Sequence, residues 1–152
     1  MSTVAIGSDH RGFPLKTFLS KHLASVGMQV RDLGCQGETE KVDYPDYAAL
    51  VCQDVVSGRA DWGILICGSG LGMSMAANKF RGIRAALCRD AKAGQMAREH
   101  NNANVLVLAG DETPEEEARQ IVTHWMNASF QAGRHQTRIE KMMGIEEREI
   151  RC

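Results

Sequence analysis

Short apolar segments alternate with longer amphipathic segments along the chain, and this alternation restricts the possible folds more than any other feature. Most of the short segments are rich in Val, Ile, Leu and Ala, as strands buried on both faces of a sheet are. They cover residues 3–8, 28–34, 62–67, 83–88 and 104–110. Strands that alternate with helices form βαβ units with parallel pairing. We therefore expect one α/β domain over residues 1–152, a three-layer sandwich around a parallel sheet of about five strands.

Helical periodicity and capping residues predict the helices between these strands. They cover residues 13–27, 43–58, 71–80, 90–101, 113–130 and 136–150. Asp46 is a candidate N-cap for the second helix. Thr113 as N-cap, Pro114 at the first helical position and three glutamates in the first turn predict the start of the fifth. Gly144 is a weak point in the last helix.

Composition and charge argue against several classes of function. Apolar residues make up 43% of the chain, charged residues 24%, and the formal net charge is −1. With no block of like charge, neither nucleic acid nor an anionic membrane is expected as a partner. No apolar run approaches a membrane span, and the start MSTVAIGSDH does not resemble a signal peptide. The five cysteines include no Cys-x-x-Cys pair, which favours reduced thiols in a cytoplasmic protein without a metal site.

The segment CGSGLGM follows the third predicted strand and is the richest candidate for a functional loop. In parallel α/β folds, ligands bind beyond the carboxyl ends of the strands, near the switch point of the topology. Gly68, Gly70 and Gly72 would let the backbone approach a ligand, and the following helix would present unpaired N–H groups. At such a position we expect the thiol of Cys67 to ionise more readily, so that it could act as a nucleophile or base, while the amides could hold an oxyanion.

Two other interpretations of this loop remain open at this point. A cysteine at a strand end is often a plain core residue. The glycines also resemble a dinucleotide fingerprint, but the third comes one residue early for G-x-G-x-x-G, and Met73 stands in its place. No acidic ribose partner lies at the expected distance, and no Gly-Lys-Ser/Thr of a P-loop occurs.

Three further groups of polar residues are candidates for the same site. They are Asp9 with His10 after the first strand, His100 with Asn101 at the end of the fourth helix, and Arg134 with Arg138 near the start of the last helix. An Asp–His pair suits proton transfer or anion contact, and arginines at i and i+4 share a face that could hold a phosphate. The alternatives are a helix cap for Asp9, a dipole partner for His100 and a solvated face for the arginines.

Several motifs together resemble one protein family. GSDHRGF, DYPDYA, GILICGSGLGMSMAANKFRGIRAALC, HNNANVL and GRHQTRIE are similar, in one register, to the ribose-5-phosphate isomerase B family, which includes galactose-6-phosphate isomerase subunits. The resemblance implies a Rossmann-like fold and an aldose–ketose isomerase that needs neither metal nor other cofactor. It also implies a homodimer or a dimer of dimers, with active sites built from two subunits.

The resemblance implies a role for each matching residue. Cys67 would be the base that moves a proton between C1 and C2 of the open-chain sugar through a cis-enediolate. Asp9 and His100 would assist ring opening, and Ser69 would lie beside the thiol. The remaining implied contacts are an anion hole of Gly68, Ser69, Gly70 and Gly72, a sugar site with Tyr44 and Asn101, and a phosphate site of His10, Arg134 and Arg138. Family members without the cysteine use a glutamate just after the last glycine, where this chain has Met73.

One departure from the family leaves the substrate open. Many relatives have a phosphate-binding arginine after the fifth strand, where this chain has Asp111 in AGDET. A carboxylate there would repel phosphate and indicates a remodelled pocket. Ribose 5-phosphate/ribulose 5-phosphate is the first expectation, and erythrose 4-phosphate/erythrulose 4-phosphate, a hexose phosphate or a free sugar are alternatives. A non-catalytic phosphosugar-binding module and a nicotinamide- or flavin-dependent oxidoreductase are the alternatives from other classes.

The last helix, within residues 134–152, bears on assembly. Ile139, Met142, Met143 and Ile150 offer apolar surface beyond the five-stranded body. A stripe of this kind usually finds a partner, so we expect it to pack on a second subunit. Packing on its own subunit is the alternative.

Overall fold

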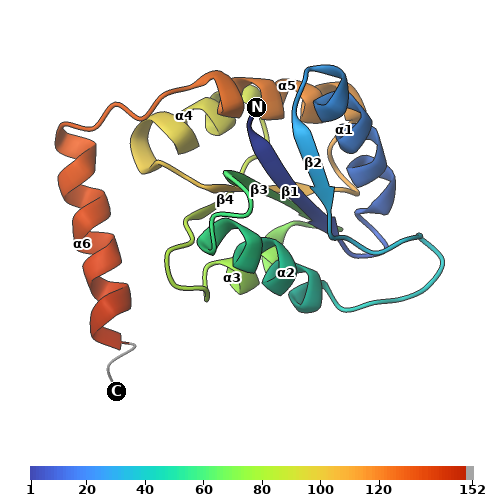
Figure 1. The fold of residues 1–152 in the computed structure, drawn as a ribbon, viewed down its shortest axis with the longest axis horizontal. Coiled ribbons are helices and arrows are strands. Elements are labelled where there is room, and N and C mark those ends of the chain that lie inside the picture. The colour runs from blue at the N-terminus through green and yellow to red at the C-terminus, as the bar shows by residue number, and fades with distance from the viewer. Residues whose placement is uncertain (150–152) are drawn as a thin grey trace.

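The computed structural model describes residues 1–149 and confirms the α/β class (Figure 1). Its strands are β1 (Thr3–Ser8), β2 (Gln29–Asp32), β3 (Trp62–Cys67), β4 (Ala85–Leu87) and β5 (Val105–Ala109). Its helices are α1 (Phe13–Ser25), α2 (Tyr44–Val56), α3 (Leu71–Ala77), α4 (Ala91–Asn101), α5 (Glu115–Asn127) and α6 (Arg134–Glu149). Each predicted strand and helix is therefore present, mostly with slightly shorter bounds.

The five strands form one parallel sheet in the order β2-β1-β3-β5-β4. The chain moves outward from β1 to β2 and then returns to the other side of β1 with β3. The boundary between β1 and β3 is therefore the switch point of the topology, where ligands bind in folds of this kind. In the register of β1 with β3, Ser8 lies opposite Ile66, so the residues that follow the two strands emerge side by side.

Helices cover both faces of the sheet, because alternate residues of each buried strand point to opposite sides (Figure 1). Ile64 and Ile66 of β3 belong to the core cluster formed with α1, α4 and α5, which contains the fully buried Trp125. Leu65 and Cys67 belong to the cluster on the other face, formed with α2 and α3. The side chain of Cys67 thus lies on the α2–α3 side of the sheet.

Two predicted N-caps are wrong, one by three residues and one by a single residue. Asp43, with extended backbone, is the N-cap of α2, and Asp46 lies in the first turn. Pro45 fits that first turn because its missing N–H would have no partner there. In α5 the N-cap is Pro114 and not Thr113, since the ψ of Pro114 is 150° and the helix begins at Glu115.

Helix α6 stands apart from the sheet and its covering helices, beyond an extended connection from α5 (Figure 1). It passes through Gly144 without a break, and its buried side chains are His135 and Ile139. Met142 is 43% exposed and Met143 half-buried, whereas Ile150 lies outside the described residues. Within residues 1–149, every helix is too short or too polar to cross a membrane.

Candidate active site

Three loops meet at the carboxyl edge of the sheet, around the end of β3. The backbone N–H of Asp9 donates to the carbonyl of Ile66 at 3.3 Å. On the other side, the N–H of Gly110 donates to the carbonyl of Cys67 at 2.8 Å, and that of Asp111 to the carbonyl of Gly68 at 3.1 Å. The loops after β1, β3 and β5 are therefore joined by main-chain hydrogen bonds, which fix the start of the glycine loop.

Cys67 ends β3 and is 4% exposed in the single chain. It differs from the other buried cysteines by its position at the glycine loop. Burial raises the pKa of Cys52 to about 12, and burial with the nearby Asp90 raises the pKa of Cys88 to about 12, so both stay protonated thiols. Cys35, Cys52, Cys67 and Cys88 are unpaired, and Cys152 lies outside the described residues.

The glycine loop has the tight geometry that its sequence predicts. Gly70 has a left-handed backbone, with φ of 75°, and a Cβ there would lie 2.5 Å from Cδ1 of Leu87. A Cβ at Gly72 would lie 2.6 Å from the hydroxyl of Tyr44, so the phenol of α2 lies directly against this loop. The hydroxyl of Ser69 accepts a hydrogen bond from the N–H of Leu71 at 3.3 Å, which gives it a local capping role.

The two polar residues after β1 lie at the same edge. Asp9 is 5% exposed, and its Oδ1 accepts a hydrogen bond from the N–H of Gly12 at 3.0 Å. This bond fixes the loop before α1, whose N-cap is Gly12, so Asp9 is not the helix cap that the alternative interpretation proposed. The N–H of Val42 donates to Nδ1 of His10 at 3.2 Å. Because Nδ1 is an acceptor, the proton of the neutral ring is on Nε2, which is left to donate to a ligand.

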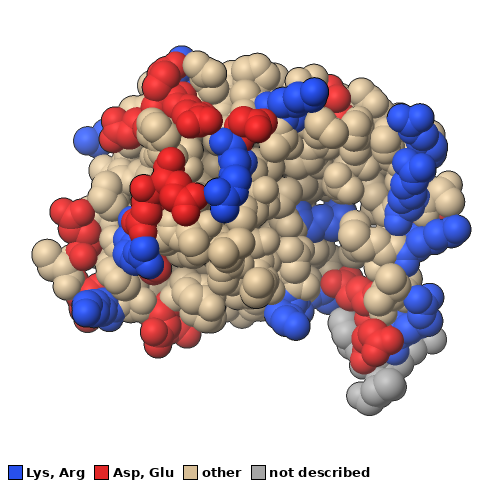
Figure 2. All heavy atoms as spheres, turned by 180° about the vertical axis from the view of Figure 1, so that it is seen from behind, with Lys and Arg blue, Asp and Glu red and all other residues tan. Residues whose placement is uncertain are grey.

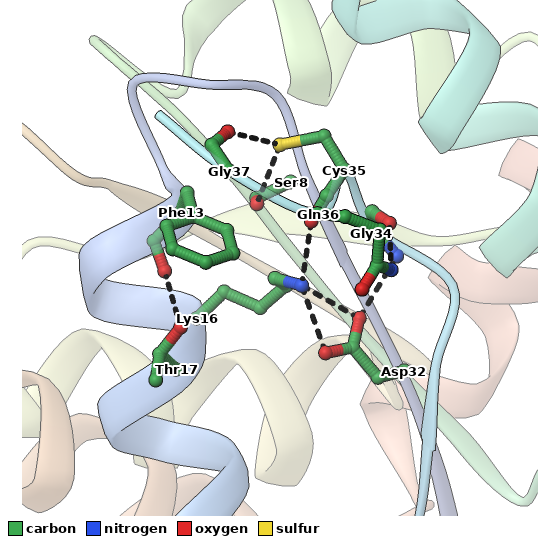
Figure 3. Close-up of polar contacts among 9 residues, drawn as sticks. All are labelled: Ser8, Phe13, Lys16, Thr17, Asp32, Gly34, Cys35, Gln36 and Gly37. Carbon is green, nitrogen blue, oxygen red and sulfur yellow. Dashed lines mark hydrogen bonds and ion pairs between the residues drawn. The ribbon is translucent and has the colours of Figure 1, made fainter. Parts of the chain in front are cut away.

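A buried lysine fixes the segment that supports His10, residues 33–43. Lys16 is 1% exposed, and its Nζ lies 2.8 Å from both carboxylate oxygens of Asp32 (Figure 3). It also donates to the carbonyl of Cys35 at 2.9 Å. The segment therefore leaves β2 in a defined direction and brings Val42 to His10.

The other predicted site residues lie at the opposite, amino-terminal edge of the sheet. His100 and Asn101 end α4 just before β5, and Arg134 and Arg138 lie in the first turns of α6. Both arginines are exposed, and Figure 2 shows basic side chains along the side of the molecule where α6 lies. Asn101 contributes to a cavity of about 650 Å³ between α6 and the body, which Met142 and Met143 also line.

His135 organises this second group and was not predicted from the sequence. Its ring stacks on that of His100, with centroids 4.3 Å apart and an angle of 9° between the planes. Burial lowers the pKa of His135, and the neighbouring His100, Arg134 and Arg138 lower it further. The sequence feature that could have identified His135 is its place in GRHQTR, between Arg134 and Arg138, which were both predicted site residues.

A single chain does not bring the candidate residues at the carboxyl edge of the sheet together with those at the amino edge. In the register of β3 with β5, Gly63 pairs with Val105 at one edge and Cys67 with Ala109 at the other. The strand from Gly63 to Cys67 therefore separates the edges by about 13 Å at a rise of about 3.3 Å per residue. Any cavity shared by Cys67, Asp9 and His100 would need a second copy of the chain.

Asp111 is not the isolated carboxylate that its sequence position predicts. Its Oδ2 forms an ion pair with Nη2 of Arg11, a residue of the β1–α1 loop that sequence reasoning did not identify. Arg11 was missed because its partner is 100 residues away in the chain. Within residues 1–149, no three His, Cys, Asp or Glu side chains gather in a group that could hold a metal ion.

Comparisons with known proteins agree on one family. The model of the ribose/galactose isomerase family matches residues 4–142. The ribose-5-phosphate isomerase B of Escherichia coli is 45% identical over 148 residues, which cover 97% of this chain and 99% of that protein. The solved structure of the Clostridium thermocellum ribose-5-phosphate isomerase B has a TM-score of 0.95 and 46% identity, covering 97% of this chain and 99% of that chain. The Mycoplasma genitalium enzyme, solved with bound ribulose-5-phosphate, has a TM-score of 0.91 and 43% identity, covering 95% and 96%.

Proposed function

The chain belongs to the ribose/galactose isomerase family, and on that premise we propose that it interconverts ribose 5-phosphate and ribulose 5-phosphate. It is an aldose–ketose isomerase by its full-length similarity to enzymes of that class. The observation that carries the proposal is the position of Cys67. It ends the strand beside the switch point and enters directly into a glycine loop that main-chain hydrogen bonds hold in place.

In the proposed reaction, the thiolate of Cys67 removes the proton from C2 of the open-chain aldose. The electron pair of that C–H bond forms the C1–C2 double bond, and the carbonyl electrons move to O1. A proton transfer between O1 and O2 then prepares the collapse to the ketose, in which the thiol returns the proton to C1. General acid–base catalysis by a positioned group of this kind contributes about a hundredfold to ten-thousandfold in rate.

The backbone of the glycine loop is suited to the negative charge that develops on the enediolate. Main-chain N–H groups that are already oriented stabilise an oxyanion without reorganisation, and one such donor contributes about 3 kcal/mol. The three glycines let neighbouring side chains pack directly against this backbone, since a Cβ at Gly68, Gly70 or Gly72 would collide with Arg11, Leu87 or Tyr44, respectively. Tyr44 borders the same loop, which supports its proposed place in the sugar site.

We assign the second half of the active site to a partner copy of the chain. The proposed ring-opening acid His100, the sugar-binding Asn101 and the phosphate-binding Arg134 and Arg138 all lie at the amino edge. In a two-fold dimer, each amino edge would face the carboxyl edge of its neighbour and complete two equivalent sites. Asp9 would assist ring opening and His10 would donate Nε2–H to the phosphate.

The rest of the proposal concerns the assembly and its surroundings. The exposed Met142 and Ile145 of α6 support packing on a second subunit in a homodimer or a dimer of dimers. The four described cysteines are free thiols, which supports a cytoplasmic location. We propose no metal or other cofactor and no nucleic-acid or membrane partner.

Solvent isotope exchange tests the proposed base. In deuterated water, the wild-type chain should introduce deuterium at C1 or C2 of the sugar phosphate, and Cys67→Ala should lose at least about a hundredfold in exchange and isomerisation. Cys88→Ala removes another buried cysteine at a strand end and should retain both activities. Unchanged exchange in Cys67→Ala would refute the assigned base. Binding of a sugar phosphate without exchange would instead indicate a non-catalytic binding module.

A tetrose phosphate is the second candidate substrate, and the observation that favours it is Asp111. The family resemblance implies an arginine at this position, and a carboxylate there, even when paired with Arg11, changes the charge at one end of the pocket. A panel of tetrose, pentose and hexose phosphates, compared by kcat/KM, decides between erythrose 4-phosphate and ribose 5-phosphate. A higher kcat/KM for the tetrose phosphate would replace the pentose in the proposal while leaving the chemistry unchanged.

A further inference from the structure

Arg11 lies over the glycine loop, in the half of the active site that a single chain contains. It stands between His10 and Gly12 in the loop after β1. A Cβ built on Gly68 would lie 2.5 Å from Nε of Arg11 and 2.7 Å from Nη1. The guanidinium is therefore in contact with the first glycine after Cys67, and a side chain at Gly68 would displace it from this position.

Asp111 holds the guanidinium in this position. It accepts from Nη2 of Arg11 through Oδ2, and its own N–H donates to the carbonyl of Gly68. The carbonyl of Arg11 also lies close to Gly110, since a Cβ at Gly110 would be 3.1 Å from it. The side chain of Arg11, which comes from the loop after β1, thus contacts the loops after both β3 and β5.

The pair leaves hydrogen-bonding capacity on the cation. A guanidinium has five N–H donors, and among the described residues only Asp111 accepts from Arg11. The Arg11 side chain is 58% exposed, so the guanidinium is accessible to a ligand beside the glycine loop. The cation of Arg11 also offsets part of the repulsion that the Asp111 carboxylate would exert on a phosphate.

We propose that Arg11 is a phosphate-binding residue of this enzyme and that Asp111 is its positioning residue. The inference rests on the proposed function, because it assigns the phosphate of that substrate to a cation on the β1–α1 loop. It locates the phosphate between Arg11, the adjacent His10 and the arginines of the partner's amino edge. A planar guanidinium fits phosphate oxygens through two parallel N–H donors, which supports this role.

Steady-state kinetics on ribose 5-phosphate and on free ribose test the assignment. Arg11→Ala should raise KM for ribose 5-phosphate about tenfold to a hundredfold, and should weaken competitive inhibition by inorganic phosphate to a similar extent. The parameters for free ribose should change little. An equal loss on both sugars, or a loss confined to kcat, would overturn the phosphate role. Arg119→Ala, which removes an exposed arginine paired with Glu116 on α5, is the matched control and should behave as wild type.

Two variants of Asp111 distinguish phosphate binding from a purely structural ion pair. Asp111→Asn keeps an acceptor for Arg11 but removes the negative charge, so KM for ribose 5-phosphate should stay the same or fall. If the pair only held loops together, Arg11→Ala and Asp111→Asn would raise KM alike. The double variant Arg11→Ala/Asp111→Arg moves the cation to the other loop and should recover most of the lost phosphate affinity. Failure to recover would count against the proposed phosphate position.

The test separates this inference from the proposed function. If the wild-type chain isomerises no sugar phosphate of the panel, the proposed function is wrong. Calorimetric titration of wild type and Arg11→Ala with inorganic phosphate then still decides the role of Arg11. Tighter binding to wild type supports the anion site, and equal binding overturns it.

Discussion

Gly70 is the residue at which strand β3 turns into helix α3, and two independent constraints act on it. Its φ of 75° disfavours any L side chain, and a Cβ would meet Leu87 at 2.5 Å. We expect Gly70→Ala to lower the free energy of unfolding by about 1–3 kcal/mol and to reduce kcat, because the loop must move. Chemical denaturation with parallel activity measurements checks this.

Gly27→Ala provides the control for backbone strain alone. Gly27 has a φ of 86° after α1, but nothing lies within 4 Å of a Cβ placed there. The free energy of unfolding of Gly27→Ala should fall by only about 1 kcal/mol, the cost of a left-handed backbone, and the variant should retain full activity. Equal losses of stability and activity in the two variants would show that the loop tolerates a side chain.

At the scale of single residues, the sequence predicts what is local in the chain. Cys67 and its glycines lie within six positions, so their pattern is visible without a fold. Arg11 and Asp111 are far apart in the chain and meet only because β1 and β5 flank β3. Asp111 alone predicts a repulsive charge, and only the folded structure shows the cation of Arg11 that pairs with it.

At the scale of elements, the contact between α4 and α6 should depend on pH. The stacked His135 has a lowered pKa in the folded chain, so the unfolded chain binds more protons below pH 6.5. This contribution to stability is complete above pH 6.5 and is lost as the pH falls through the lowered pKa. We expect the denaturation midpoint of the wild-type chain to decrease as the pH is lowered from 7.5 to 5.5. The decrease should be less steep in His135→Phe.

The matched control for this prediction is His124→Phe, which changes an exposed histidine on α5. It should keep the wild-type dependence on pH. Hydrogen exchange localises the effect, since α6 should lose protection on acidification before the central strands do. An identical slope in wild type and His135→Phe would contradict the assigned histidine.

The order and type of the helices and strands could be predicted from the sequence, because the hydrophobic periodicity of each segment and the glycines at its ends are local features. The starts of α2 and α5 did not follow so closely. In both, a proline lies in or beside the first turn, and either it or a preceding residue can be the N-cap. The position of α6 involves contacts between distant residues, such as His135 with His100, which no local pattern encodes.

At the scale of the whole molecule, a site divided between two copies predicts complementation. Cys67→Ala damages the carboxyl edge and His100→Asn the amino edge, so each variant alone should be inactive. After dissociation and reassociation of an equal mixture, half of the dimers are mixed, and each contains one intact site. About a quarter of wild-type activity should therefore return, by the symmetry of a two-fold dimer.

A mixture of Cys67→Ala with Asp9→Asn is the control, because both changes affect the carboxyl edge. No mixed dimer then contains an intact site, and the activity should stay near zero. Recovery in this control, or none in the first mixture, would contradict the shared site. The separation of the two groups could be inferred from the sequence, since His100 precedes a strand whereas Cys67 follows one, and parallel strands place these positions at opposite edges of the sheet.

The proposed division of the site between two copies of the chain also has a genetic consequence. In such a dimer, a protein altered at one edge and made in the same cell as the normal protein would still leave one working site in each mixed pair. A protein altered at both edges would leave none, so it would disable every normal chain with which it pairs. Such a doubly altered allele would be dominant-negative, although each of its two lesions alone would be largely masked.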